Sequence, residues 1–255
     1  MIAPGRAKRP GTRRPALDPP SPDELDSCPF CAGHEEMTPP QTLVLPEAGE
    51  WRVRVVPNLY PALDRQEVVV HSRRHVRSIA ELESEEIDLV AEAWRRRAEA
   101  EPGHLFPLLN EGREAGASRP HSHSQLVWLP EQPPVRARPK GDPFLELGGL
   151  AAMCPWASRL PYETVIAPIE PEADGLSSPL LAPALRLLAG LVRRLHDLEG
   201  PVPLNAWLES GGGDWRIVLL PRLTVLAGLE LGAGIFVNTL PPEEAAARLK
   251  DEGPR

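Results

Sequence analysis

Apolar and polar positions alternate in several short stretches of the chain, which is the pattern of half-buried β-strands. The clearest are residues 51–56 (WRVRVV) and the β-branched stretch 67–71 (EVVVH). The same pattern predicts further strands at 104–110, 121–129, 164–167, 205–208 and 215–220. The first fifty residues are rich in proline, arginine and acidic side chains, and we expect extended segments and turns there, without a helix.

A second period, with apolar residues three and four positions apart, predicts three helices. The first begins at Ser84, which is expected to cap it, and ends before Pro102-Gly103. The others are expected at 183–198 and 242–250. The order strand, strand, helix, strand, strand therefore occurs twice, and a proline- and arginine-rich stretch at 130–143 is the expected linker. We predict an α+β fold of two halves, 1–140 and 141–255, each an antiparallel sheet with a packed helix.

Composition narrows the class of protein. The 255 residues carry 28 Lys+Arg against 36 Asp+Glu, a formal net charge of −8, which argues against a general nucleic-acid binder. No run of 18 apolar residues exists, so we expect no membrane partner. The basic N-terminus is not followed by an apolar stretch, so it is not expected to be a secretory signal, and the expected location is the cytoplasm.

Three polar residues share one face of the strand expected at 121–129. His121, His123 and Gln125 alternate in sequence, so their side chains point the same way within an otherwise apolar strand. A single strand histidine is usually a hydrogen-bonded surface residue, but three polar groups on one face favour a site. The small-residue loop 110–118 opens onto this strand, and such loops let backbone N–H groups approach phosphate oxygens.

The cysteines suggest a metal site or a redox pair. Cys28-Pro29-Phe30-Cys31 is a C-x-x-C sequence, and only one further cysteine, Cys154, occurs in the chain. A redox C-x-x-C normally opens a helix after a strand. The prolines and glycine around this one favour a knuckle turn that binds a metal.

Five stretches together resemble the galactose-1-phosphate uridylyltransferase family, within the histidine-triad superfamily. They are residues 3–10, 28–40, 51–62, 110–125 and 224–249, so the resemblance covers nearly the whole chain. The family usually has His-Pro-His in its central motif, and here Ser122 replaces the proline. The resemblance implies two histidine-triad-like halves.

The resemblance also implies a covalent mechanism. His123 matches the family's nucleophile, which takes a nucleoside monophosphate from a UDP-sugar or other nucleotide sugar and passes it to a sugar 1-phosphate. Gln125 matches a residue that bonds phosphoryl oxygens and favours transfer over hydrolysis. Two alternatives stay open: a nucleotide-sugar or dinucleotide phosphorylase that uses inorganic phosphate, and a non-catalytic, zinc-stabilised nucleotide-binding protein.

Further site residues follow from the same resemblance. Those matching phosphate or nucleotide contacts are Arg6, Arg9, Asn58, Asn110, Gly116 and Ser118, although the two arginines could equally belong to a solvated basic tail. The implied ligands of one structural zinc are Cys28, Cys31, His75 and His121. No second metal site is expected, because Asp214-Trp215-Arg216 stands where larger relatives have His-x-His. Family members are usually homodimers, and Glu230 and Asn238 are candidates for contact with a partner subunit.

Overall fold

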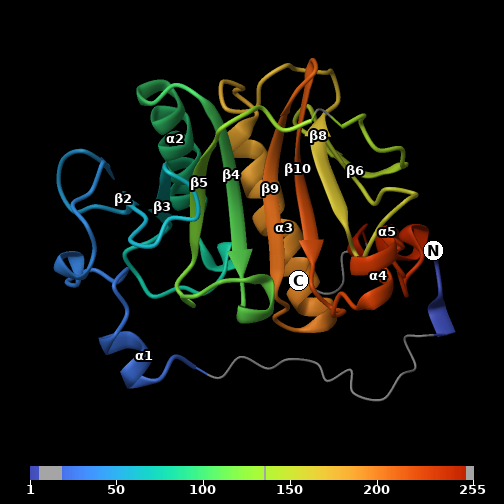
Figure 1. Cartoon of the computed structure of the whole chain (residues 1–255), viewed down its shortest axis with the longest axis horizontal. Helices are drawn as coiled ribbons and strands as arrows, with labels where there is room; N and C mark the ends of the chain where they lie inside the picture. Colours follow the sequence, from blue (N-terminus) through green and yellow to red (C-terminus); the bar gives the residue numbers. More distant parts are fainter. Residues whose placement is uncertain (6–18, 135, 251–255) are drawn as a thin grey trace.

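A single ten-stranded antiparallel sheet runs through the protein, in the order β1-β2-β3-β5-β4-β9-β10-β8-β7-β6 (Figure 1). The computed structural model describes residues 1–5, 19–134 and 136–250. The strands are β1 Leu43–Leu45, β2 Val53–Pro57, β3 Gln66–Val70, β4 His104–Glu111, β5 His123–Leu129, β6 Pro143–Leu147, β7 Leu150–Met153, β8 Thr164–Pro168, β9 Leu204–Gly211 and β10 Asp214–Pro221.

The strand order reads the same from either edge of the sheet. Strands β1 to β5 form one set and β6 to β10 the other, and the sets meet where β4 pairs with β9, Leu108 lying opposite Trp207. The α+β class expected from the sequence is confirmed. The two sheets expected from the repeated strand order are joined edge to edge into one, so the sheet is continuous across the molecule.

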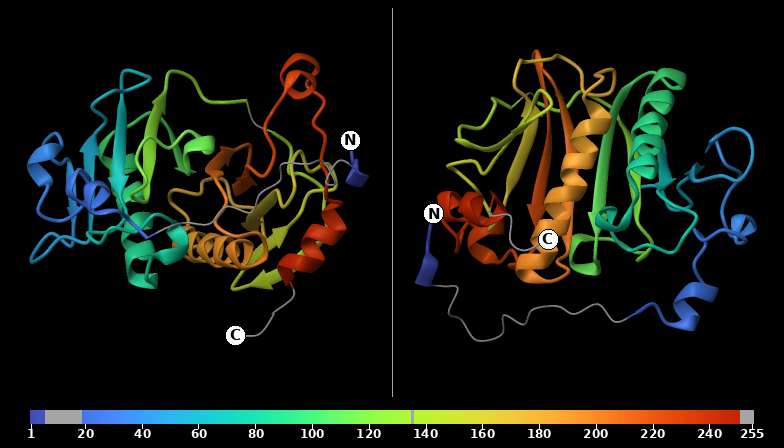
Figure 2. Two further views of the ribbon diagram at one scale, coloured as in Figure 1. Left: turned by 90° about the horizontal axis from the view of Figure 1, so that it is seen from below. Right: turned by 180° about the vertical axis from the view of Figure 1, so that it is seen from behind.

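Two long helices lie on the same face of the sheet, as the view from behind shows (Figure 2). They are α2 (Ser84–Ala100) and α3 (Leu181–Glu199), and their apolar sides pack on the sheet to form the main core. Among the described residues, no long helix lies on the opposite face of the sheet (Figure 1). His123 and Gln125 point toward that face, because Ser124 between them points toward α2. None of the helices in the described ranges is long and apolar enough to cross a membrane.

Two sequence predictions about helices were wrong. Residues before position 50 do contain a helix, α1 (Pro22–Asp26), because the Ser21 side chain accepts a hydrogen bond from the Glu24 N–H and Pro22 suits a first turn. Helix α2 is capped by Glu83, not by Ser84, in a capping box completed by Glu86.

The remaining elements are short and lie at the ends of the sheet. The chain forms 3₁₀ turns at Glu35–Met37, Ile79–Glu81 and Arg113–Ala115, and helices α4 (Gly228–Ala233) and α5 (Pro242–Lys250). The α5 helix has the bounds expected from the sequence, whereas α4 was not expected. The N-terminal residues lie beside the C-terminal part of the chain (Figure 1), where the Ala3 N–H donates to the Asn238 carbonyl.

Candidate active site and metal centre

His123 begins β5 and is buried on the open face of the sheet. Its side chain is 6% exposed, and its Nδ1–H donates to the His121 carbonyl at 2.7 Å. Burial lowers the pKa of His123, and the hydrogen bond to that carbonyl opposes the effect only in part, so the ring is neutral near pH 7. Because Nδ1 is engaged, Nε2 is the ring nitrogen available to react.

The strand itself starts later than expected from the sequence. His121 and Ser122 precede β5 instead of belonging to it. Ser124 points to the opposite face, where its hydroxyl accepts a hydrogen bond from the Trp94 indole at 2.9 Å. This buried bond ties the strand to α2.

Four potential metal ligands gather beside the histidine strand. The ligand atoms of Cys28, Cys31, His75 and His121 all lie within 4.8 Å of one another. Cys28 Sγ lies 3.4 Å from His121 Nδ1, and Cys31 Sγ lies 3.2 Å from His75 Nδ1. A tetrahedral zinc with ordinary Zn–S and Zn–N bonds would hold sulfur and nitrogen about 3.6 Å apart. The donor set and its spacing therefore fit one zinc-sized ion.

Each of the two histidines in the cluster has its outer nitrogen bonded to the protein. His121 Nε2–H donates to the Ser72 carbonyl at 3.0 Å, and His75 Nε2–H donates to the Glu24 carboxylate at 2.9 Å. Glu24 is held in turn by the Arg77 guanidinium, at 2.7 Å from Nε. These bonds leave the Nδ1 lone pairs facing the cysteines, which is the arrangement found around metal-binding histidines.

Electrostatics in the metal-free chain favour neutral ligands. Burial lowers the pKa of His121 to about 3 and raises the pKa of the Cys31 thiol to about 12, with the neighbouring Cys28 adding to the second shift. A bound divalent ion would stabilise the thiolates, so binding releases protons.

The redox alternative for the cysteine pair does not fit this environment. Cys28 follows α1 and leads into turns, not into a helix. Both cysteines also face histidine nitrogens, as expected of metal ligands.

The C-x-x-C turn is braced against the sheet by residues that sequence reasoning missed. The buried Arg54 of β2 donates to the Pro29 carbonyl and to the Thr38 hydroxyl, both at 2.9 Å. Phe30, between the two cysteines, places its ring 5.3 Å from that of His123. The turn thus supplies both metal ligands and an apolar wall beside the candidate nucleophile.

The end of β4 and the loop between β4 and β5 carry three residues that the family resemblance implies for phosphate binding: Asn110, Gly116 and Ser118. Register places Leu109 opposite Ser124, so Asn110 comes next to His123 across the ladder. Asn110 Oδ1 accepts from Asn205 Nδ2 at 2.7 Å, a contact between the two strand sets that the sequence did not reveal. Gly116 and Ser118 are exposed on the same loop, and Gly116 has a left-handed backbone (φ 92°).

The remaining residues expected in the site do not belong to this loop. Gln125 Oε1 accepts from Gln66 Nε2 of the neighbouring strand β3, which orients the amide. Asn58 is half-buried just after β2, where its side chain accepts from the Tyr60 N–H in a turn. Arg6 and Arg9 lie outside the described residues.

Asn238 and Glu230 have roles within their own chain. Asn238 is 1% exposed, and its side chain donates to the Ser158 and Leu160 carbonyls. Its expected contact with a partner subunit is therefore wrong, because its polar atoms are buried and bonded internally. The Glu230 carboxylate accepts from the Ala227 N–H at the start of α4.

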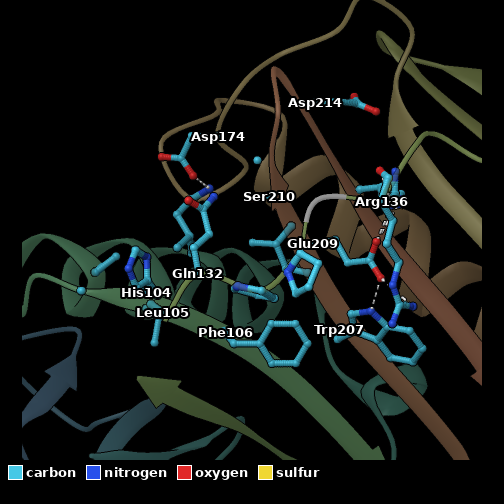
Figure 3. Close-up of a pocket in the computed structure, with 18 of the residues that line it drawn as sticks. His104, Leu105, Phe106, Gln132, Arg136, Asp174, Trp207, Glu209, Ser210 and Asp214 are labelled. Atoms are coloured by element: carbon cyan, nitrogen blue, oxygen red, sulfur yellow. Dashed lines mark hydrogen bonds and ion pairs between the residues drawn. The ribbon is translucent and has the colours of Figure 1, made fainter. Parts of the chain in front are cut away.

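A cavity of about 670 Å³ opens on the same face of the sheet, beside β4 and β9 where the two strand sets meet (Figure 3). Trp207 and Glu209 of β9 and Phe106 of β4 line it, and His123 does not. Glu209 pairs with the Arg216 guanidinium at 2.6 Å, so the charges in its wall are largely matched.

The site combines a buried histidine at the start of β5 with a Cys₂His₂ cluster, beside the open face of one antiparallel sheet. A family model described as "Galactose-1-phosphate uridyl transferase, N-terminal domain" matches residues 60–134. A galactose-1-phosphate uridylyltransferase of Streptomyces lividans is 31% identical over 290 residues, covering 89% of this chain and 79% of that protein. The chain belongs to the galactose-1-phosphate uridylyltransferase family.

Other relatives cover still more of the chain. An ADP-glucose phosphorylase of Arabidopsis thaliana is 26% identical over 317 residues, covering 98% of this chain and 89% of that protein. The crystal structure of an ADP-glucose phosphorylase from Arabidopsis thaliana with bound ADP-glucose has the same fold, with a TM-score of 0.84 at 21% identity over 99% of this chain and 95% of that one.

Proposed function

We propose that the chain transfers a nucleoside monophosphate from a nucleotide sugar to a phosphate-bearing acceptor through a covalent bond to His123. One observation carries the proposal. His123 is neutral, its Nδ1–H is bonded to the His121 carbonyl, and its Nε2 is left on the open face of the sheet beside the loop that follows β4. A fixed, neutral imidazole is a nucleophile that works near pH 7.

The reaction has two steps. His123 Nε2 attacks the α-phosphorus, the bond from that phosphorus to the sugar 1-phosphate oxygen breaks, and the nucleotidyl group stays on the ring. An acceptor phosphate oxygen then attacks the same phosphorus, and the P–N bond breaks to return neutral His123. The positive charge on the intermediate ring is stabilised by the His121 carbonyl, which accepts from Nδ1–H at 2.7 Å.

The neighbouring polar residues are assigned to the phosphates and the nucleotide. Gln125, held by Gln66, can donate its amide N–H to a phosphoryl oxygen while offering no proton-handling group to water. We assign the phosphates to Asn110, Gly116 and Ser118, and the nucleotide side to Asn58. Arg6 and Arg9 are further candidates for the nucleotide.

The acceptor distinguishes two versions of this function. The first acceptor is a sugar 1-phosphate, as in a hexose-1-phosphate uridylyltransferase. The second is inorganic phosphate, and the similarity to an ADP-glucose phosphorylase over 98% of the chain favours it. Both versions use the same histidine and the same intermediate.

The metal has a structural part in this proposal. Cys28, Cys31, His75 and His121 would hold one zinc, which ties the N-terminal turn to the residue whose carbonyl orients His123. None of the chemical steps is routed through it.

The test is to incubate the protein with UDP-sugars and with ADP-glucose, and to measure its intact mass. We expect a nucleotidyl adduct whose mass names the base, and discharge by glucose 1-phosphate or by inorganic phosphate names the acceptor. His123→Ala should abolish the adduct, while His104→Ala, which removes an exposed histidine at the start of β4, should retain it.

Two results would count against the proposal. An adduct on the His123→Ala protein would move the nucleophile elsewhere. Nucleotide binding without any adduct on the wild-type protein would favour the non-catalytic alternative.

A further inference from the structure

His71 is a buried histidine that the proposed reaction does not use. It follows β3, is 1% exposed, and lines a small void together with apolar side chains that include Ile79, Val90 and Trp94. Its Nδ1 lies 2.9 Å from the Ser122 hydroxyl, while its Nε2 has no hydrogen-bond partner among the described residues. An unpaired polar atom in such surroundings costs stability, so a benefit elsewhere has to offset it.

Ser122 receives two hydrogen-bonding contacts from the same histidine. The His71 side chain meets the Ser122 hydroxyl, and the His71 N–H donates to the Ser122 carbonyl at 3.3 Å. The Ser122 N–H donates to the Val76 carbonyl at 2.7 Å. All polar groups of Ser122 are therefore engaged, and the residue is 2% exposed.

These contacts act on the peptide that orients the candidate nucleophile. The peptide unit between His121 and Ser122 presents its carbonyl to His123 Nδ1–H and its N–H to the Val76 carbonyl. A rotation of this peptide would break the bond that fixes the His123 ring. Proline at position 122, the usual residue of the family motif, would restrict the backbone through its ring but would lack the N–H. Serine lacks that restriction, and its hydrogen bonds supply it instead.

We propose that His71 and Ser122 form a positioning pair that holds the His121–Ser122 peptide, and with it the His123 ring, in the orientation needed for attack. The inference rests on the proposed function, because it concerns the rate at which His123 accepts a nucleotidyl group. Neither residue touches the substrate. Their contribution is to hold His123 Nε2 in the position from which it attacks the α-phosphorus.

The chain offers a matched control for the test. Ser122 and Ser124 flank His123, both are buried, and both hydroxyls are hydrogen-bonded on the helix side of the sheet, Ser122 to His71 and Ser124 to Trp94. Ser122→Ala should slow the single-turnover rate of nucleotidylation by about tenfold at saturating nucleotide sugar, with little change in its dissociation constant. Ser124→Ala should change the rate by less than about twofold. Ser122→Thr, which keeps the hydroxyl, should restore most of the rate.

A second variant tests the pair as a unit. His71→Phe removes the ring nitrogens while filling the apolar site, and it should slow the same step. If the two residues act together, the double variant His71→Phe/Ser122→Ala should be no slower than the slower single variant. Metal content is measured in every variant, so that a slow protein with full metal is separated from one that has lost its ion.

The outcomes separate the inference from the proposed function. If the wild-type protein forms no adduct, the proposed function fails. If it forms the adduct and Ser122→Ala matches Ser124→Ala in rate, the positioning role is wrong. Additive effects of the two substitutions would also overturn it, because they would show independent roles for His71 and Ser122.

Discussion

The tautomer of each histidine in the site is set by the atom that its second nitrogen bonds. Carbonyl and carboxylate oxygens only accept from neutral imidazole, so His121 and His75 present Nδ1 to the cysteines, whereas His123 presents Nε2 to the open face. Two imidazoles only two residues apart therefore point differently, that of His121 toward the cysteines and that of His123 toward the open face. The Ser72 and His121 carbonyls set the tautomers of His121 and His123, and the Glu24 carboxylate sets that of His75.

Removing one cysteine of the cluster tests the metal site. Cys28→Ser should lower the zinc content from about one per chain and lower the melting temperature by roughly 10 °C, because a structural ion contributes directly to folding free energy. Cys154→Ser is the control, since Cys154 is a buried thiol outside the cluster. Metal analysis and thermal unfolding measure both quantities. Wild-type protein purified without chelator that holds no zinc would contradict the assignment.

The four members of the Cys₂His₂ cluster could be predicted from the sequence because each belongs to a motif of the family. Glu24 and Gln66 could not. Glu24 lies on a five-residue helix without buried residues, and it reaches His75 only through the folded arrangement of the N-terminal segment. Gln66 has no distinguishing neighbours in sequence, and its role depends on strand pairing with β5.

Among the elements, the end of β4 shows how the loop beside His123 is anchored. Glu111, the last residue of β4, is buried, and its carboxyl accepts from the Ile79 N–H at 2.6 Å and from the Ser78 hydroxyl at 2.7 Å. Burial raises the pKa of Glu111 to about 7, and its two hydrogen bonds only partly oppose the shift. This carboxyl fastens the turn Ile79–Glu81 to the strand that leads into the candidate phosphate loop.

The pH dependence of stability should reveal this carboxyl. Its pKa is raised on folding, so the folded protein holds its proton more tightly. That stabilising contribution is complete below the unfolded pKa of about 4.3 and is lost as the pH rises through about 7. Glu111→Gln should therefore gain stability relative to wild type between pH 5 and 8, by up to about 3 kcal/mol. Denaturant unfolding across this range measures it. The exposed Glu114→Gln should leave the profile unchanged, and an equal effect there would contradict the prediction.

Elements with a clear apolar period could be predicted from the sequence, and elements without one could not. The strands on either side of the linker and the closing helix α5 follow from their apolar patterns. Strands β1 and β7 have three and four residues, which is too short to show a period. Strand β6 is as long as β2 and β3, but it has no β-branched residue and begins with a proline. These strands form because each pairs with the edge of a neighbouring strand, and that pairing depends on the folded arrangement of the chain.

At the scale of the whole molecule, the segment after β10 carries several exposed apolar side chains. Val225, just before α4, is 88% exposed, and Leu231, within α4, is 73% exposed. Exposed apolar side chains in one short segment are typical of a contact surface. We therefore propose that the protein forms the homodimer implied by the family resemblance, with this segment in the interface.

Light scattering tests the dimer. The wild-type protein should have the mass of two chains at micromolar concentration, and Val225→Asp/Leu231→Asp should shift it toward one chain, since buried charges oppose association. Leu59→Asp changes an exposed apolar residue that is distant in sequence from this segment, and it should leave the mass unchanged. A wild-type monomer would contradict the proposal.

The symmetric strand order has a consequence for stoichiometry. Turning the sheet about the Leu108–Trp207 pair carries β5 onto β10, because Leu108 lies opposite Gln125 and Trp207 lies opposite Val218. His123, two residues before Gln125, then falls on Arg216, two residues before Val218. The Arg216 guanidinium is paired with Glu209 and, as a group of N–H donors without an acceptor lone pair, cannot attack phosphorus. Although the strand order of the sheet is symmetric, only one half carries a nucleophile at this position. Covalent labelling by a nucleotide sugar should therefore saturate at one nucleotidyl group per chain.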